Sequence, residues 1–135
     1  MVIIDSSVII DLLSGRMTAQ TSWLRRQPDL ERMGITTLIL SEVLQGIRDE
    51  GIFAETLAIL SQFVILETGG RDLATDSARN YRVLRKRGIT IRSTIDCITA
   101  TFCINEEHEL LHNDRDFDPF EEHLELVVVH PEILN

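Results

Sequence analysis

The chain has 135 residues, a length that suits one compact domain burying roughly two thirds of the surface of its unfolded chain. We therefore expect a single domain over residues 1–135. Apolar residues make up 44%, and no uncharged run approaches the roughly 20 residues that cross a bilayer, which excludes a membrane-spanning protein. The amino end also lacks the basic start and long apolar stretch of a signal peptide, so we expect a cytoplasmic protein without a membrane partner.

Apolar residues along the chain predict strands that alternate with helices. The run Val2-Ile3-Ile4 is apolar without alternation, as in a parallel strand covered on both faces. Capping, spacing and stop signals predict helices at 6–15, 18–27, 38–49, 51–63 and 71–87, and from 94 onward. Strands are expected at 2–4, 34–37, 64–66, 109–112 and 124–129. This alternation predicts a three-layer α/β/α domain with a mostly parallel central sheet.

Asp5 directly follows the first predicted strand. In open α/β sheets ligands bind beyond the carboxyl ends of the strands, so an acid placed there is directed at a site. The alternative is that Asp5 caps the helix that begins after it. The sequence leaves both interpretations open.

Three further segments carry acids in comparable places. Glu42 lies one position from the apolar stripe of its predicted helix, where it faces a cleft or borders the core. Asp96 falls in the first turn of a predicted helix, where an acid also interacts favourably with the helix dipole. Asp114 and Asp116 follow the strand at 109–112, and alternating carboxylates after a strand do not fit a core.

Basic residues gather near the end of the helix expected at 71–87. Five of the thirteen lie within eleven positions: Arg82, Arg85, Lys86, Arg87 and Arg92. Cations at a helix carboxyl end interact with the dipole and solvate an exposed face. Alternatively, they form a rim that binds phosphates, which a protein of net charge −9 would need if its partner is a nucleic acid.

Together these motifs resemble the pattern of PIN-domain nucleases. The resemblance spans essentially the whole chain, in the order Ile4-Asp5-Ser6-Ser7, Ser41-Glu42, Thr94-Ile95-Asp96 and Leu110-Leu111-His112-Asn113-Asp114-Arg115-Asp116-Phe117. Length and motif order are most similar to the VapC toxins, the ribonuclease halves of bacterial and archaeal VapBC toxin–antitoxin pairs.

The resemblance implies a PIN-like fold and one catalytic pocket lined by Asp5, Glu42, Asp96 and Asp114. Among these, Asp5, Asp96 and Asp114 would bind Mg²⁺ or Mn²⁺, with Ser7 and Asp116 as accessory groups. His112 stands where the family often has Thr or Ser. That departure leaves the division of labour between Asp114 and Asp116 open.

The chemistry of the acids agrees with this resemblance. Neighbouring carboxylates repel one another, so a cluster with only oxygen ligands is best explained by a hard divalent cation. Such a cation lowers the pKa of a bound water and neutralises charge on a phosphoryl group. The chemistry and the resemblance together predict a metal-dependent endoribonuclease, and the resemblance implies that it acts as the toxin of a type II toxin–antitoxin pair. The alternative is a PIN-fold module that binds nucleic acid or protein without catalysis, which the intact acid set disfavours.

The resemblance also implies partners, namely an RNA substrate, a VapB-type antitoxin and a second copy in a homodimer. An antitoxin would silence the pocket by presenting Arg or Lys to the carboxylates. The apolar helices around Trp23 and Phe53 offer a groove for an amphipathic segment of that antitoxin.

Overall fold

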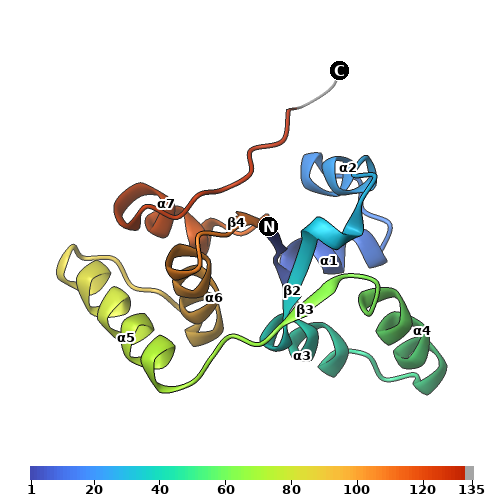
Figure 1. Cartoon of the computed structure of the whole chain (residues 1–135), viewed down its shortest axis with the longest axis horizontal. Helices are drawn as coiled ribbons and strands as arrows, with labels where there is room; N and C mark the ends of the chain where they lie inside the picture. The colour runs from blue at the N-terminus through green and yellow to red at the C-terminus, as the bar shows by residue number, and fades with distance from the viewer. Residues whose placement is uncertain (133–135) are drawn as a thin grey trace.

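A four-stranded sheet, parallel throughout, forms the centre of the molecule (Figure 1). The computed structural model describes residues 1–132. Along the sheet the strands follow the order β3-β2-β1-β4. Their bounds are β1 Val2–Ile4, β2 Met33–Thr36, β3 Val64–Leu66 and β4 Glu109–Leu111. The four strands predicted at 2–4, 34–37, 64–66 and 109–112 are therefore confirmed.

Helices connect the strands and cover the sheet. Their bounds are α1 Ser6–Leu13, α2 Ala19–Arg25, α3 Thr37–Gln45, α4 Glu50–Leu60, α5 Arg71–Lys86, α6 Thr94–Asn105 and α7 Asp118–Leu124, with 3₁₀ turns η1 Leu30–Arg32 and η2 Arg115–Phe117. In Figure 1, α1 to α4 lie on one side of the strands and α5 to α7 on the other. Within the described part of the chain, no helix is both long and apolar enough to cross a membrane.

The strand order creates the crevice in which the candidate site lies. The chain passes outward through β1, β2 and β3, then crosses back and places β4 on the free side of β1. Parallel crossovers share one hand, so this reversal moves the covering helices to the opposite face. The connections leaving β1 and β4 therefore diverge, and ligands of open α/β sheets bind at such a point. Asp5 follows β1 there, and Asp114 lies three residues after β4.

The core lies between the sheet and its two helical layers. Ile3 and Ile4 of β1, Ile35 of β2, and Leu110 and Leu111 of β4 are fully buried. Burial on both faces explains why these strands have no polar alternation. The result is the three-layer α/β/α architecture predicted from the sequence.

The strand predicted at 124–129 is wrong. Helix α7 continues to Leu124, and Glu125 then takes a left-handed conformation with φ of 64° that ends the helix. Between Glu125 and residue 132, where the described part of the chain ends, an isolated parallel bridge from Leu110 to Val128 takes the place of a strand. The run Val127-Val128-Val129 has the β-branched composition of a strand, but it pairs with β4 through two hydrogen bonds, both made by Leu110.

The fully buried Leu110 offers a test of this core. We expect Leu110→Ala to lower the free energy of unfolding by about 2–5 kcal/mol, because the methyl groups removed leave a cavity between two layers. Leu57→Ala on α4 makes the same chemical change at a side chain that is 37% exposed, and it should cost less than about 1 kcal/mol. Urea unfolding of the two variants measures both values. Equal losses would contradict the placement of β4 in the core.

Candidate metal centre

Asp5 combines both roles that the sequence left open. Its Oδ2 accepts hydrogen bonds from the backbone N–H of Ser7 at 3.0 Å and from the Ser7 hydroxyl at 2.6 Å, so it caps α1. The side chain is only 2% exposed, and its Oδ1 has no hydrogen-bond partner among the described residues. Burial raises the pKa of Asp5 more than the hydrogen bonds from Ser7 lower it. One oxygen thus serves the helix while the other is left without a partner.

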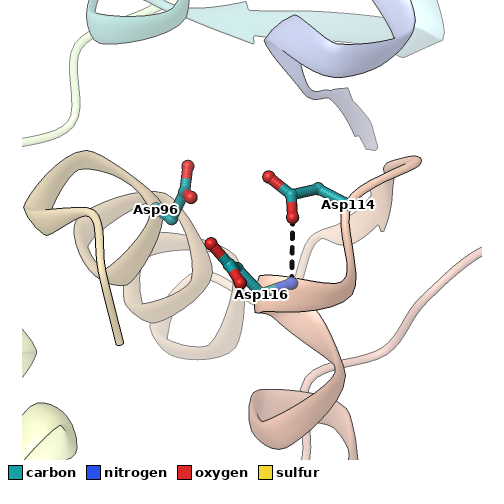
Figure 2. A group of neighbouring side chains, drawn as sticks. All are labelled: Asp96, Asp114 and Asp116. Carbon is teal, nitrogen blue, oxygen red and sulfur yellow. Dashed lines mark hydrogen bonds between the residues drawn. The ribbon is translucent and has the colours of Figure 1, made fainter. Parts of the chain in front are cut away.

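Three more aspartates meet at the end of β4. Asp96, Asp114 and Asp116 each place a carboxylate oxygen within 4.8 Å of the other two (Figure 2). Asp96 comes from the first turn of α6, but the cap of that helix is Ser93, whose hydroxyl accepts the N–H of Asp96. The carboxylate of Asp96 is therefore not needed as a cap, and the residue is only 8% exposed.

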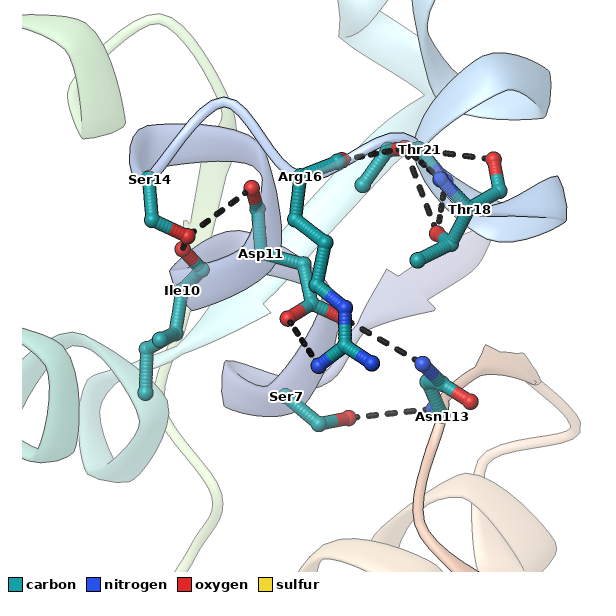
Figure 3. A network of polar contacts seen from close by, with 8 residues as sticks. All are labelled: Ser7, Ile10, Asp11, Ser14, Arg16, Thr18, Thr21 and Asn113. Atoms are coloured by element: carbon teal, nitrogen blue, oxygen red, sulfur yellow. Dashed lines mark hydrogen bonds and ion pairs between the residues drawn. The ribbon is translucent and has the colours of Figure 1, made fainter.

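The loop after β4 holds Asp114 through several hydrogen bonds. The N–H of Asn113 donates to the Ser7 hydroxyl at 3.1 Å, and the Asn113 amide donates to Asp11 at 3.2 Å (Figure 3). The N–H of Asp114 donates to Nδ1 of His112 at 3.1 Å. Because the Ser7 hydroxyl also donates to Asp5, one side chain connects the first acid to the loop that carries Asp114. Neither the Asn113 contacts nor the His112 contact was predicted from the sequence.

The negative charges of the crevice act on one another. Burial, followed by the charges of Asp5 and Asp114 and then of Glu42 and Asp116, raises the pKa of Asp96 to about 7. Burial and the charge of Asp5 likewise raise the pKa of Glu42. The five acids chosen from the sequence therefore share one electrostatic environment.

The structure brings these acids together at two levels. Asp96, Asp114 and Asp116 form the closest group. Asp116 was predicted as an accessory group, yet its carboxylate oxygen lies within 4.8 Å of that of Asp96, as the oxygen of Asp114 does. Asp5 and Glu42 border the group from the end of β1 and from α3. The assignment of individual ligands remains a prediction.

The donor set fits a hard divalent cation. Oδ1 of Asp5 and Oε1 of Glu42 are buried and lack hydrogen-bond partners within residues 1–132. An unpartnered buried carboxylate oxygen is costly, and a cation removes that cost and the repulsion between acids. The donors that these acids offer are all oxygens, which suits Mg²⁺, Mn²⁺ or Ca²⁺ better than the softer metals.

The predicted basic residues lie outside this acid group. Arg82, Arg85 and Lys86 are exposed on the last turns of α5, Arg87 is its cap, and Arg92 precedes Ser93. Two of them contact rings, since Arg85 lies 5.6 Å from the centre of the Tyr81 ring and Arg87 is 3.4 Å from Nδ1 of His123. Their role in binding RNA remains a prediction.

An apolar groove reaches the acids from the other side. It is formed by α1, α3 and α4, has a volume of about 530 Å³, and includes the exposed side chains Ile10, Ile52 and Ile59. Glu42 also lines this groove, so the groove leads to the crevice. Of the two helices that the sequence indicated for such a groove, α4, which carries Phe53, borders it, although Phe53 itself is not among the lining residues. Trp23 of α2 lines a separate hollow beside Met1 and Met33.

Fold and site together define an α/β protein with a parallel sheet whose carboxylates gather where the strand order reverses. A comparison with known families matches residues 2–122 to the PIN domain, and the chain belongs to the PIN domain family.

Individual relatives are similar over most of the chain. The VapC ribonuclease Mb1587 of Mycobacterium bovis and ribonuclease VapC11 of Mycobacterium tuberculosis are each 25% identical over 120 residues, covering 87% of this chain and 90% of theirs. A toxin-antitoxin complex from Klebsiella pneumoniae contains a chain of the same fold, with a TM-score of 0.71 and 22% identity over 99% of this chain and 100% of that one.

The raised pKa of Asp96 predicts how stability depends on pH without metal. The folded state holds the Asp96 proton up to about pH 7, whereas the carboxyl group ordinarily loses it near 3.8. The stability gained from this group is therefore complete below pH 3.8 and is lost as the pH rises through about 7. In chelator, we expect Asp96→Asn to melt at a higher temperature than the parent at pH 8 and to lose this advantage at pH 4.

Asp72 provides the matched control for this experiment. It also lies in the first turn of a helix, α5, but it is exposed and outside the acid group. Asp72→Asn should leave the melting temperature unchanged or lower it slightly, because an acid there interacts favourably with the helix dipole. If Asp96→Asn is instead destabilised at pH 8, Asp96 serves the helix and not the acid group.

Proposed function

We propose that this protein is a metal-dependent endoribonuclease and acts in the cytoplasm as the toxin of a type II toxin–antitoxin pair. The observation that carries the proposal is the group of three carboxylates within 4.8 Å, bordered by the unpartnered oxygens of Asp5 and Glu42, in a PIN domain. The two VapC ribonucleases that are 25% identical to the chain support the same activity.

In this proposal Asp5, Asp96 and Asp114 hold Mg²⁺ or Mn²⁺, and Asp116 supports them. When bound, the cation lowers the pKa of a water and neutralises charge that develops on the scissile phosphate. Ser7 occupies Oδ2 of Asp5 with two hydrogen bonds, so Oδ1 is the oxygen left to bind. Glu42 would accept at Oε1 the proton that the attacking water gives up, a role that suits a carboxylate whose pKa is raised by burial.

The basic end of α5 supplies a route for the substrate. Arg92 lies four residues before Asp96, and the exposed Arg and Lys side chains at 82, 85, 86 and 87 precede it. We propose that they bind phosphates of the RNA on the side of the crevice where α6 begins. Their positive charge offsets locally the repulsion between RNA and a chain of net charge −9.

RNA cleavage with purified protein tests the enzymatic proposal. We expect cleavage with Mg²⁺ or Mn²⁺, none in chelator, and losses of roughly 100-fold or more in Asp5→Asn and Asp96→Asn, since even groups behind a metal ligand are worth about 10–100-fold. Asp72→Asn should retain full activity.

At a hundredfold excess over the dissociation constant, Mg²⁺ should stabilise the parent by about 2.7 kcal/mol, on the order of 10 °C, and Asp96→Asn far less.

Two outcomes would overturn this proposal. Cleavage that survives both Asn substitutions would place the chemistry elsewhere in the chain. Metal binding without cleavage of any RNA would instead support a PIN-fold module that binds nucleic acid or protein without catalysis.

We infer that the inhibitory partner is an antitoxin that occupies the groove between α1, α3 and α4. The exposed isoleucines of this groove suit the apolar face of a helix, and Glu42, which interacts with the charge of Asp5, is among the lining residues. An Arg or Lys of the partner would there reach the carboxylates and neutralise them. The resemblance to VapC toxins further supports a homodimer.

Co-expression with the product of the neighbouring gene tests this partner. We expect an earlier elution volume and suppressed RNA cleavage. Ile52→Asp, at a groove residue that is 54% exposed, should weaken the complex roughly tenfold or more, because it places a charge in an apolar contact. Val127→Asp, at a side chain 58% exposed and outside the groove, should leave affinity unchanged. Unaltered activity and elution of the parent on co-expression would overturn the inference.

A further inference from the structure

His112 is buried beside the acids without being one of the predicted ligands. It follows β4, is 8% exposed, and its ring centre lies 4.9 Å from that of Phe117. Its Nδ1 accepts the N–H of Asp114 at 3.1 Å. A ring nitrogen that accepts carries no proton, so the proton of the neutral ring is on Nε2.

The contact of His112 has the same form as two others in the site. The side chain of Asp5 accepts the N–H of Ser7, and that of Asp114 accepts the N–H of Asp116, each two residues further along the chain. This is the geometry of an Asx turn, which fixes the backbone that follows the accepting side chain. In His112 a ring nitrogen takes the place of the carboxylate oxygen.

The turns of His112 and Asp114 follow one another directly. Nδ1 of His112 holds the N–H of Asp114, and Oδ1 of Asp114 holds the N–H of Asp116 at 2.9 Å. The second turn therefore begins at a residue whose backbone the first turn has fixed. These two bonds link the His112 ring to the backbone of both aspartates whose carboxylates lie near Asp96.

We propose that His112 is a positioning residue of the acid group, and that Nδ1 sets the separation of the Asp96, Asp114 and Asp116 carboxylates. The proposal rests on the proposed function, because that separation matters for holding a divalent cation. Groups that orient a metal ligand are commonly worth about 10–100-fold in metal affinity. His112 itself remains outside the set of ligands.

Two substitutions at this position separate positioning from packing. His112→Phe keeps a ring that packs on Phe117 but removes the acceptor. His112→Asn removes most of the packing but keeps an acceptor, since Oδ1 of Asn reaches the N–H two residues on in an ordinary Asx turn. A merely structural role predicts that Asn is the more damaging change. A positioning role predicts the opposite for metal affinity.

We expect Mn²⁺ to bind His112→Phe roughly tenfold or more weakly than the parent, and His112→Asn within about threefold of it, as titration calorimetry measures. In chelator, the melting temperatures should fall in the other order, with Asn below Phe, because the Asn variant leaves a cavity against Phe117. Amide hydrogen exchange provides a reading that needs no metal. The N–H of Asp114 should lose protection in the Phe variant and keep it in the Asn variant.

His108 offers a matched control. It immediately precedes β4, at the end of the strand opposite His112, and its ring lies 5.5 Å from that of Phe102. His108→Phe makes the same replacement at the opposite end of the same strand, and it should leave Mn²⁺ affinity unchanged.

The outcomes distinguish this proposal from the proposed function. Equal Mn²⁺ affinity of the parent and His112→Phe, while Asp96→Asn loses binding, overturns only the role of His112. The role of His112 is also overturned if Mn²⁺ binds the less stable Asn variant more weakly than the Phe variant. If the parent neither binds Mn²⁺ nor cleaves RNA, the proposed function fails. Even then, loss of hydrogen-exchange protection at the Asp114 N–H in the Phe variant, but not in the Asn variant, would support the positioning contact.

Discussion

The mutual repulsion of buried carboxylates is the constraint on which the rest of this structure depends. Acids from α3, α6 and the ends of β1 and β4 share one crevice, where burial and neighbouring charge raise the pKa of Asp5, Glu42 and Asp96. Unfolding would let these groups separate into water. The folded state persists because the acids are attached to elements held by an apolar core that is independent of them.

That core separates stability from chemistry. The strands contribute fully buried side chains such as Ile4 and Leu111, and the acid-bearing loops follow immediately after them. Local hydrogen bonds then fix the loops, with Ser7 bonded both to Asp5 and to the backbone of Asn113. The repulsion between the acids is tolerated because the packed layers that carry these loops stabilise the fold.

Much of the fold follows from local patterns, whereas the assembly of the site depends on strand order. The apolar run before Asp5 and the Ser93 cap before Asp96 correctly predicted a strand end and a helix start. Nothing local indicates that β4 lies beside β1, which is what brings Asp114 toward Asp5. The contact between His112 and Asp114 was equally hidden, because a ring nitrogen in an Asx-like turn leaves no composition signal.

The valine run near the carboxyl end is a case in which the sequence predicted a strand that the structure does not contain within residues 1–132. Its β-branched residues satisfy the pattern of a strand, yet this run meets the sheet at an edge and pairs there at one position. Local propensity is a weak guide at an edge, because tertiary contacts decide how far pairing extends. Helix α7 was also not predicted, because Phe120 is the one buried residue among its seven, so the apolar stripe that marks a helix in a sequence is nearly absent.

The double role of Asp5 restricts how this protein can lose its acid without losing its fold. The same carboxylate caps α1 and leaves Oδ1 in the crevice without a hydrogen-bond partner among residues 1–132. Asn caps a helix nearly as well as Asp, whereas Ala at such a position costs about 1 kcal/mol. An inactive descendant of this protein would therefore tend to retain Asn, Ser or Thr at position 5. In related sequences, such a residue after the first strand would be the mark of a site that has lost its charge but kept its helix.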